Sequence, residues 1–396
     1  MTRSGFGCCV LVAMALMGCN ELPPVVPPSA IVAAPPAPVT FEQAVLNAGN
    51  AVFTAAGGSG RQVLVIDPLV NGVTGEQSGA TRALGARLAD LARRSYPQID
   101  VQPFRAEILA AAPLVMVGTF TPVNAQNQPA GAREAYRFCL VVADLKTGKT
   151  VAKSVARATL AGVDATPTRA FADSPAWTED ASVKAYVNTC QATKVGDPIP
   201  PAYLNGIITA AVISQAAEAY DAGRYAEALS LYENARTTAA GDQLRVHNGL
   251  YMSRLKLGQR AQAEAAFGDL VEHGLRNNRL AVKLLFRPAS TAYADAQAGG
   301  VYAMWLQQIA DRSAKSTSCL QVTGHTSASG SAVLNDRLSV LRAEYVKSQL
   351  ERDAAALRGR LVAAGMGGQQ PLIGTGTDDA SDALDRRVEF KVIPAC

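Results

Sequence analysis

The chain has 396 residues, of which 48% are hydrophobic and 18% are charged, and its formal net charge is +4 at pH 7. A chain of this length exceeds one ordinary hydrophobic core, so we expect two or three folded domains. The positive charges are spread along the sequence and form no basic run interleaved with aromatic residues, which gives no support to a nucleic-acid-binding function.

The N-terminus, residues 1–18, has the pattern of a signal peptide. Arg3 supplies a positive charge, and the apolar stretch of about ten residues that follows is too short to span a bilayer as a stable helix. The stretch ends in Leu16-Met17-Gly18-Cys19, which resembles the lipobox of bacterial lipoproteins. The resemblance implies cleavage before Cys19, lipidation of Cys19 and, because Asn20 follows, a place in the outer membrane on its periplasmic side. The alternative is a plain signal peptide with a chance cysteine.

Four of the seven cysteines remain once the signal peptide and Cys19 are set aside. An even number in an oxidising compartment suggests disulfide bonds, and four cysteines allow three pairings. We favour Cys139–Cys190 and Cys319–Cys396, because each pair then lies within one predicted domain. The sequence contains no CxxC pair and no histidine pair at ligand spacing, so it predicts no metal site.

Residues 19–40 are rich in proline and contain three Pro-Pro pairs. Proline fixes φ and removes backbone donors, so this segment should be an extended, semi-rigid tether behind the lipid anchor. Thr40-Phe41-Glu42-Gln43 then has the pattern of a capping box and predicts a helix that ends near residue 53.

Residues 41–197 alternate strand and helix patterns, which predicts an α/β domain. Lys146-Thr147-Gly148-Lys149 joins the last two predicted strands as a hairpin turn. The predicted helix is 76–95, and the predicted strands are residues 63–66, 99–104, 114–121, 135–144 and 150–157.

The Thr-Gly-Lys-Thr sequence at this turn lacks the upstream glycine of a P-loop and precedes a strand, which argues against a nucleotide site. The order of elements in this domain, with Val117-Gly118-Thr119 and the segment 142–151, resembles the periplasmic α/β domain of CsgG-, FlgO- and LpoB-type lipoproteins. That resemblance implies a role in envelope assembly without enzymatic activity.

Residues 198–278 begin at a proline-rich boundary and carry a helical repeat pattern. Small, aromatic and leucine residues recur around Gly223 and again around Gly258, about one tetratricopeptide period later. The region resembles two tetratricopeptide repeats, at about residues 207–273, which should pack on a neighbouring domain or form a groove for an envelope protein partner. The alternative is an ordinary helical hairpin between two domains. His247 and His273 have no ligand partners at useful spacing.

Residues 279–396 combine strand and helix patterns and predict a compact α/β sandwich. The expected fold class of the whole chain is therefore multidomain, with an α/β domain, a short helical region and this sandwich. The predicted helices of the sandwich are 301–314 and 335–361, and its predicted strands are residues 283–286, 319–323, 371–374 and 388–392.

Three motifs stand at characteristic spacing in this last region. They are Gly324-His325-Thr326, then Asn335-x-x-Leu338-Ser339-x-x-Arg342-Ala343-x-x-Val346, then Gly374-x-Gly376 together with Arg386-Arg387-Val388-Glu389. Together they resemble the OmpA C-terminal domain family, which includes the peptidoglycan-associated lipoproteins. The resemblance covers residues 280–396 and implies non-covalent binding to the diaminopimelate of peptidoglycan stem peptides. It implies that the binding residues are Thr326, Ser327, Asn335, Leu338, Arg342 and Arg387.

Arg342 is the central residue of the implied site. A guanidinium can bind a carboxylate of diaminopimelate with two parallel hydrogen bonds. Asn335 would cap the helix that it opens, and Arg387 would add a second cation. Thr326 and Leu338 would shape the pocket beside the guanidinium.

Two residues depart from the family pattern. Ser327 replaces the usual aspartate, and a serine offers the ligand ammonium only a neutral hydrogen bond, which costs about 1–2 kcal/mol, or about tenfold or more in affinity. Asp385 replaces the usual asparagine and could pair with Arg386 or compete for Arg342. The alternatives for the motif residues are that Arg342 is a solvated surface residue and that His325 is structural.

These observations predict an outer-membrane lipoprotein that binds peptidoglycan and tethers the outer membrane to the cell wall. The alternative is a periplasmic assembly or adaptor lipoprotein that acts through its repeats and α/β domain, with weak or no peptidoglycan binding. The sequence presents no nucleophile–base pair, metal cluster or carboxylate pair at defined spacing, so it predicts neither an enzyme nor a cofactor.

Overall fold

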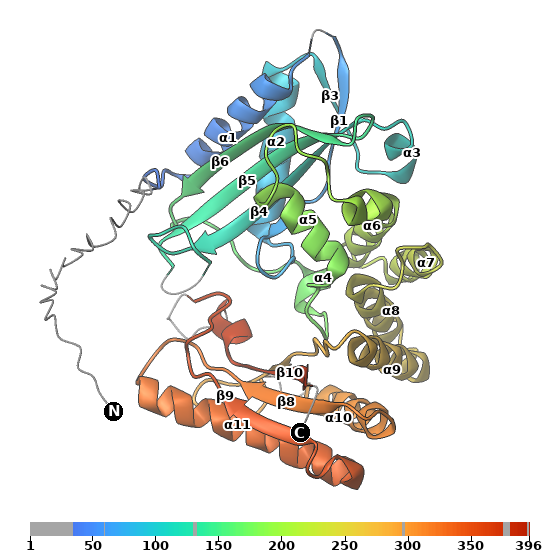
Figure 1. Cartoon of the computed structure of the whole chain (residues 1–396). Coiled ribbons are helices and arrows are strands. Elements are labelled where there is room, and N and C mark those ends of the chain that lie inside the picture. The colour runs from blue at the N-terminus through green and yellow to red at the C-terminus, as the bar shows by residue number, and fades with distance from the viewer. Residues whose placement is uncertain (1–34, 59, 130–132, 295–297, 375–380, 394–395) are drawn as a thin grey trace, which may run out of the picture. The chain divides into compact units, whose positions relative to one another are not determined.

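The structure, a computed structural model shown in Figure 1, describes residues 35–58, 60–129, 133–294, 298–374, 381–393 and 396. The predicted signal peptide, the lipidation site Cys19 and most of the proline-rich segment lie outside these residues. Residues Pro35–Cys396 form one compact unit. Within the described part of the chain, every helix is too short or too polar to cross a membrane.

A six-stranded mixed sheet organises the N-terminal half, with the strand order β3-β1-β4-β5-β6 and with β2 paired to β4. Strand β1 is parallel to β3 and β4, whereas β5 is antiparallel to both of its neighbours, β4 and β6. The five predicted strands are confirmed. The six strands are β1 (Gln62–Ile66), β2 (Val70–Asn71), β3 (Ile99–Gln102), β4 (Leu114–Val123), β5 (Ala135–Asp144) and β6 (Lys149–Ala158).

Helices cover both faces of this sheet. Alternate residues of a strand point to opposite faces, so Met116 of β4 packs in one core while Val115 and Val117 pack in the other. The first core is closed by α1 (Phe41–Ala56) and α2 (Gly79–Ser95), and the second by α5 (Ala181–Gln191) and α6 (Pro201–Asp221).

Two local predictions in this half are confirmed. Helix α1 begins at Phe41, where the Thr40 hydroxyl accepts a hydrogen bond from the Gln43 backbone N–H at 3.3 Å. The Gln43 side chain donates to Asn47 instead of completing the predicted capping box. The predicted disulfide Cys139–Cys190 is present and joins β5 to α5 across a Cα–Cα distance of 6.0 Å. Two short helices, α3 (Ala106–Leu109) and α4 (Arg169–Ala172), lie in the connections.

Four consecutive helices fill the predicted repeat region: α6, α7 (Tyr225–Arg236), α8 (Leu244–Lys256) and α9 (Arg260–Arg276). Gly223 and Gly258 end two of them with φ of 77° and 73°, a left-handed conformation that glycine adopts without a Cβ clash. The region packs on the C-terminal half, because the Phe267 ring stacks on Trp305 of α10 (Ala298–Lys315) with centroids 5.2 Å apart. One hydrophobic cluster therefore continues from these helices into the C-terminal sheet.

The C-terminal half contains a four-stranded sheet with the order β7-β10-β8-β9, packed with α10 and α11 (Ala332–Asp353) (Figure 1, orange to red). Strands β8 and β9 are parallel, and β10 is antiparallel to β7 and β8. The predicted disulfide Cys319–Cys396 is present. The strands are β7 (Leu284–Leu285), β8 (Cys319–Gly324), β9 (Leu361–Gly365) and β10 (Arg387–Ile393), and the 3-10 helices are η1 (Ala355–Leu357) and η2 (Ser381–Asp385).

Two predicted elements of this half are wrong. The helix predicted over residues 335–361 begins and ends earlier, and Gly359, with φ of 79°, turns the chain so that Leu361 pairs with Leu320 as the first residue of β9. The predicted strand 371–374 is not a strand. Three of its backbone N–H groups donate to the carboxylate of Asp385 at 2.5–2.9 Å, so a side chain replaces a strand partner.

Candidate functional site

The six predicted binding residues meet at one end of the C-terminal sheet. Thr326 and Ser327 follow His325 just after the end of β8, and Arg387 is the first residue of β10. The Arg387 carbonyl accepts a hydrogen bond from the His325 backbone N–H at 2.8 Å. Asn335, Leu338 and Arg342 are contributed by the first half of α11. The motifs that are separate in the sequence are therefore neighbours in the fold.

Close contact between α11 and the sheet holds this site together. A Cβ atom at Gly324 would overlap the Ser339 carbonyl oxygen, and one at Gly365 would overlap the Ser339 hydroxyl. The Ser339 hydroxyl also accepts a hydrogen bond from the Gly367 backbone N–H at 3.0 Å. Gly324 and Ser339 are therefore small because β8 and α11 lie too close together for larger side chains.

Substituting Gly324 by alanine is expected to destabilise the protein by about 2 kcal/mol or more, because the new methyl group meets backbone rather than a flexible side chain. The shift of the urea midpoint, followed by tryptophan fluorescence, measures this effect. Gly300→Ala on α10 is the matched control, because its Cβ would meet nothing within 4 Å, and it should change stability by about 1 kcal/mol or less. Equal midpoints for the two variants would contradict the close contact.

Arg342 lies completely buried beneath the site, with 0% of its surface exposed. Its Nη1 donates to the His325 carbonyl at 2.8 Å, and its Nε and Nη2 donate to the carbonyls of Ser290 and Arg287 at 2.9 and 2.8 Å. The guanidinium also lies 5.3 Å from the centre of the Phe286 ring. Arg342 therefore joins α11 to two other segments, and its interpretation as a solvated surface residue is wrong.

The other predicted binding residues are buried or half-buried. Thr326 and Ser327 are buried, and the two hydroxyls of Ser327 and Ser329 lie 3.2 Å apart. The Thr326 hydroxyl finds no hydrogen-bond partner among the described residues, which leaves a polar group for a ligand to satisfy. Leu338 is half-buried.

Asn335 does not cap the helix as predicted. Helix α11 begins one turn earlier, at Ala332, with Ser331 as its N-cap residue. The Asn335 side-chain amide instead donates to the Ser329 carbonyl at 2.9 Å, which ties the loop after β8 to the helix. The predicted start of the helix is wrong because the side chain of Asn335 bonds to the preceding loop and not to the backbone of the helix that follows.

Arg387 is buried and paired within the protein. Its Nε donates to the Glu389 carboxylate at 2.5 Å, and its guanidinium lies 5.9 Å from the Trp177 ring. Burial and then the charge of Arg387 lower the pKa of the buried His325 to about 4, so this histidine is neutral at pH 7. The second predicted cation is thus compensated by Glu389, and His325 holds the backbone of the site.

His247 and His273, for which the sequence shows no partner at ligand spacing, lie together in a second cluster. Both imidazoles lie 2.8 Å from the same carboxylate oxygen of Asp242. The two histidines come from α8 and α9, so only the packing of these helices brings them together. The one local signal for this cluster in the sequence is Asp242, a carboxylate directly before Gln243, the N-cap residue of α8.

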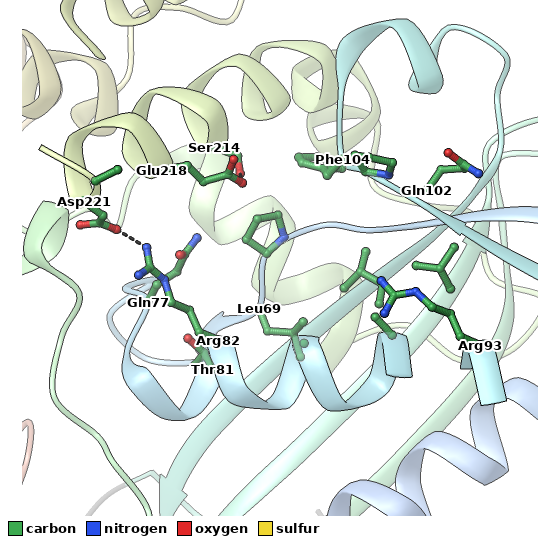
Figure 2. Close-up of a pocket in the computed structure, with 17 residues that line it drawn as sticks. Leu69, Gln77, Thr81, Arg82, Arg93, Gln102, Phe104, Ser214, Glu218 and Asp221 are labelled. Carbon is green, nitrogen blue, oxygen red and sulfur yellow. Dashed lines mark hydrogen bonds and ion pairs between the residues drawn. The ribbon is translucent and has the colours of Figure 1, made fainter. Parts of the chain in front are cut away.

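A cavity of about 770 Å³ opens in the N-terminal half, at the carboxyl ends of the parallel strands β1 and β3. Figure 2 shows Arg82 of α2 reaching across this cavity to Asp221 of α6, with which it forms an ion pair. Glu218 on the same helix pairs with Arg105 at 2.8 Å. Ligands often bind at this edge of an α/β sheet, but here the named charges are already paired.

Comparison with known proteins places the C-terminal region in a family. Residues 285–384 match the model of the OmpA family, so the chain carries an OmpA-like C-terminal domain. This span contains five of the six predicted binding residues, and Arg387 lies just beyond it. No curated protein matches the chain.

Several solved structures resemble parts of the chain. The peptidoglycan-associated lipoprotein from Burkholderia pseudomallei is 26% identical, with 28% of this chain and 89% of that chain covered and a TM-score of 0.25. The cell wall anchor of the T6SS from Pseudomonas aeruginosa is 25% identical, with 32% of this chain and 96% of that chain covered and a TM-score of 0.24. The OmpA-like domain of FopA1 from Francisella tularensis is 19% identical, with coverages of 28% and 73% and a TM-score of 0.23.

Proposed function

We propose that this protein is an outer-membrane lipoprotein that binds peptidoglycan non-covalently through its OmpA-like domain and tethers the outer membrane to the cell wall. The observation that carries the proposal is the family match over residues 285–384, which contains Thr326, Ser327 and Arg342. Lipidation of Cys19 would supply the membrane anchor, and the proline-rich segment would supply the reach to the cell wall.

The chemistry of these residues suits diaminopimelate, which carries carboxylates and an ammonium group. A ligand carboxylate that reaches Arg342 would displace the carbonyls of Ser290 and Arg287, and so would exchange neutral acceptors for charged ones. Charge-assisted hydrogen bonds are about twice as strong as neutral ones, which favours the exchange. Binding therefore requires the segment 287–290 to shift away from α11.

Ser327 is expected to limit the affinity of this site, because it offers the ligand ammonium a neutral oxygen. Replacing Ser327 by aspartate is expected to strengthen co-sedimentation of the full chain with purified sacculi by about tenfold in affinity. Free diaminopimelate should compete with the sacculi. Ser348→Asp is the matched control, because Ser348 is exposed further along α11 and the substitution makes the same change in charge.

Two outcomes distinguish the alternatives. Binding by the wild type that Ser327→Asp strengthens and Ser348→Asp leaves unchanged supports a diaminopimelate site. No binding by the wild type, together with no gain from Ser327→Asp, would sink the peptidoglycan proposal. In that case the OmpA-like domain would have kept its fold and lost its ligand.

A second candidate function is that of a periplasmic assembly or adaptor lipoprotein with weak or no peptidoglycan binding. The complete burial of Arg342 favours it, because the principal cation is not presented to solvent. The protein would then act through a CsgG/FlgO-like α/β domain (residues 41–197) and tetratricopeptide-like helices (residues 198–278), with the OmpA-like domain (residues 279–396) as support. Cross-linking in intact envelopes through residues 207–273 should trap a partner protein, and contacts confined to this chain would contradict this function.

A further inference from the structure

Asp242, His247 and His273 form a compact cluster where α8 begins and α9 ends. His247 Nε2 and His273 Nδ1 each lie 2.8 Å from Asp242 Oδ1, and one potential ligand atom from each residue lies within 4.8 Å of the others. The two imidazole rings are 4.8 Å apart between centroids. Three groups that bind metal ions therefore converge on one point.

The three side chains differ in their freedom to move. The side chains of His247 and His273 are 9% and 7% exposed, so packing fixes both rings. The Asp242 side chain is 65% exposed and can rotate to admit an ion.

The cluster is open to solvent on one side. A cavity of about 300 Å³ is lined by Asp242 and His273 and by neighbouring residues that include Lys184 and Asn277. The cavity provides a path for an ion and room for a water molecule at a fourth coordination position. Arg276 lies 3.9 Å from Asp242 Oδ2, and because its side chain is 60% exposed it can turn away when an ion neutralises the carboxylate.

We propose that Asp242, His247 and His273 bind a divalent transition-metal ion, with Zn²⁺ as the preferred ion. Two imidazoles, one carboxylate and an open fourth position are typical of tetrahedral zinc, whereas Ca²⁺ and Mg²⁺ take oxygen ligands. Tetrahedral ligands about 2.0–2.1 Å from zinc are roughly 3.3 Å apart. Asp242 Oδ1 therefore needs to withdraw from each imidazole by about half an ångström, and ligand atoms that are up to 4.8 Å apart need to approach one another. The ion would hold the start of α8 against the end of α9.

The test is calorimetric titration of the full chain with ZnCl₂ after its free thiols have been alkylated. We expect one equivalent of zinc to bind the wild type and about a hundredfold loss of affinity in the His247→Gln/His273→Gln double variant. His325→Gln is the matched control, because it removes a buried histidine outside the cluster and should keep the stoichiometry. Circular dichroism checks that each variant is folded.

A second variant and a second readout keep the test decisive if the double variant fails to fold. Asp242→Asn changes one exposed group and should weaken zinc binding by about tenfold or more. At the same zinc concentration, zinc should raise the melting temperature of the wild type more than that of Asp242→Asn, and the tetrahedral visible spectrum of Co²⁺ should develop at a lower cobalt concentration with the wild type. Absence of saturable binding to the wild type, or equal binding by wild type and Asp242→Asn, would overturn the proposal.

Discussion

Arg342→Ala is expected to destabilise the C-terminal domain by about 3–5 kcal/mol, a larger effect than the loss of any ligand contact would explain. The Arg342 guanidinium donates to three backbone carbonyls, and one of these hydrogen bonds, to His325, is fully buried. Removing the guanidinium leaves these carbonyls without their donor, each at a cost of about 1–3 kcal/mol, and opens a cavity beside Phe286. Urea unfolding monitored by the fluorescence of Trp305 measures the change.

Arg337→Ala on the same helix is the control for this experiment. Arg337 is exposed, and its removal should change the free energy of unfolding by about 0.5 kcal/mol or less. Similar urea midpoints for Arg342→Ala and Arg337→Ala would show that the buried guanidinium is not structural. The expected difference also explains why Ser327→Asp is the better probe of binding: Arg342→Ala loses fold and ligand site together.

The sequence predicts that the three C-terminal motifs lie close together, because each motif contains residues whose size or spacing a close contact requires. Gly324 is the glycine that allows α11 to approach β8, and Ser339 and Arg342 lie one turn apart on the same helix. The burial of Arg342 could not be predicted. Two of its acceptors, the carbonyls of Arg287 and Ser290, belong to a segment more than fifty residues earlier in the chain, and backbone carbonyls carry no sequence signal.

The remaining errors have the same physical origin, a side chain that bonds to a distant segment. Asp385 accepts the N–H groups of residues 372–374, so a stretch with strand-like composition becomes a loop. Asp242 accepts from histidines on two helices, so two residues with no local pattern become a cluster. Periodicity predicts which face of an element is buried, but it does not predict which polar groups tertiary packing will join.

Asp67→Asn is expected to raise the free energy of unfolding by about 3–4 kcal/mol more at pH 8 than at pH 4. Asp67 directly follows β1 and is only 5% exposed. Burial raises the pKa of its carboxyl from 3.8 to about 7, although a hydrogen bond from the Tyr203 hydroxyl and the charge of Arg245 act to lower it. The Tyr203 hydroxyl lies 2.8 Å from Asp67 Oδ2, and an asparagine oxygen can accept the same bond.

The direction of this pH dependence follows from the raised pKa. In the unfolded chain Asp67 loses its proton near pH 3.8, whereas the folded protein keeps the proton until about pH 7. The contribution of this group to stability is therefore complete below pH 3.8 and is lost progressively as the pH rises from 3.8 through 7, because over this range the unfolded chain has released a proton that the folded protein still holds. Asparagine stays neutral throughout, so the difference in urea midpoint between variant and wild type should grow between pH 4 and pH 8. Asp90→Asn, at an exposed position on α2, is the control, and a difference for Asp67→Asn that does not vary with pH would contradict a buried, protonated carboxyl.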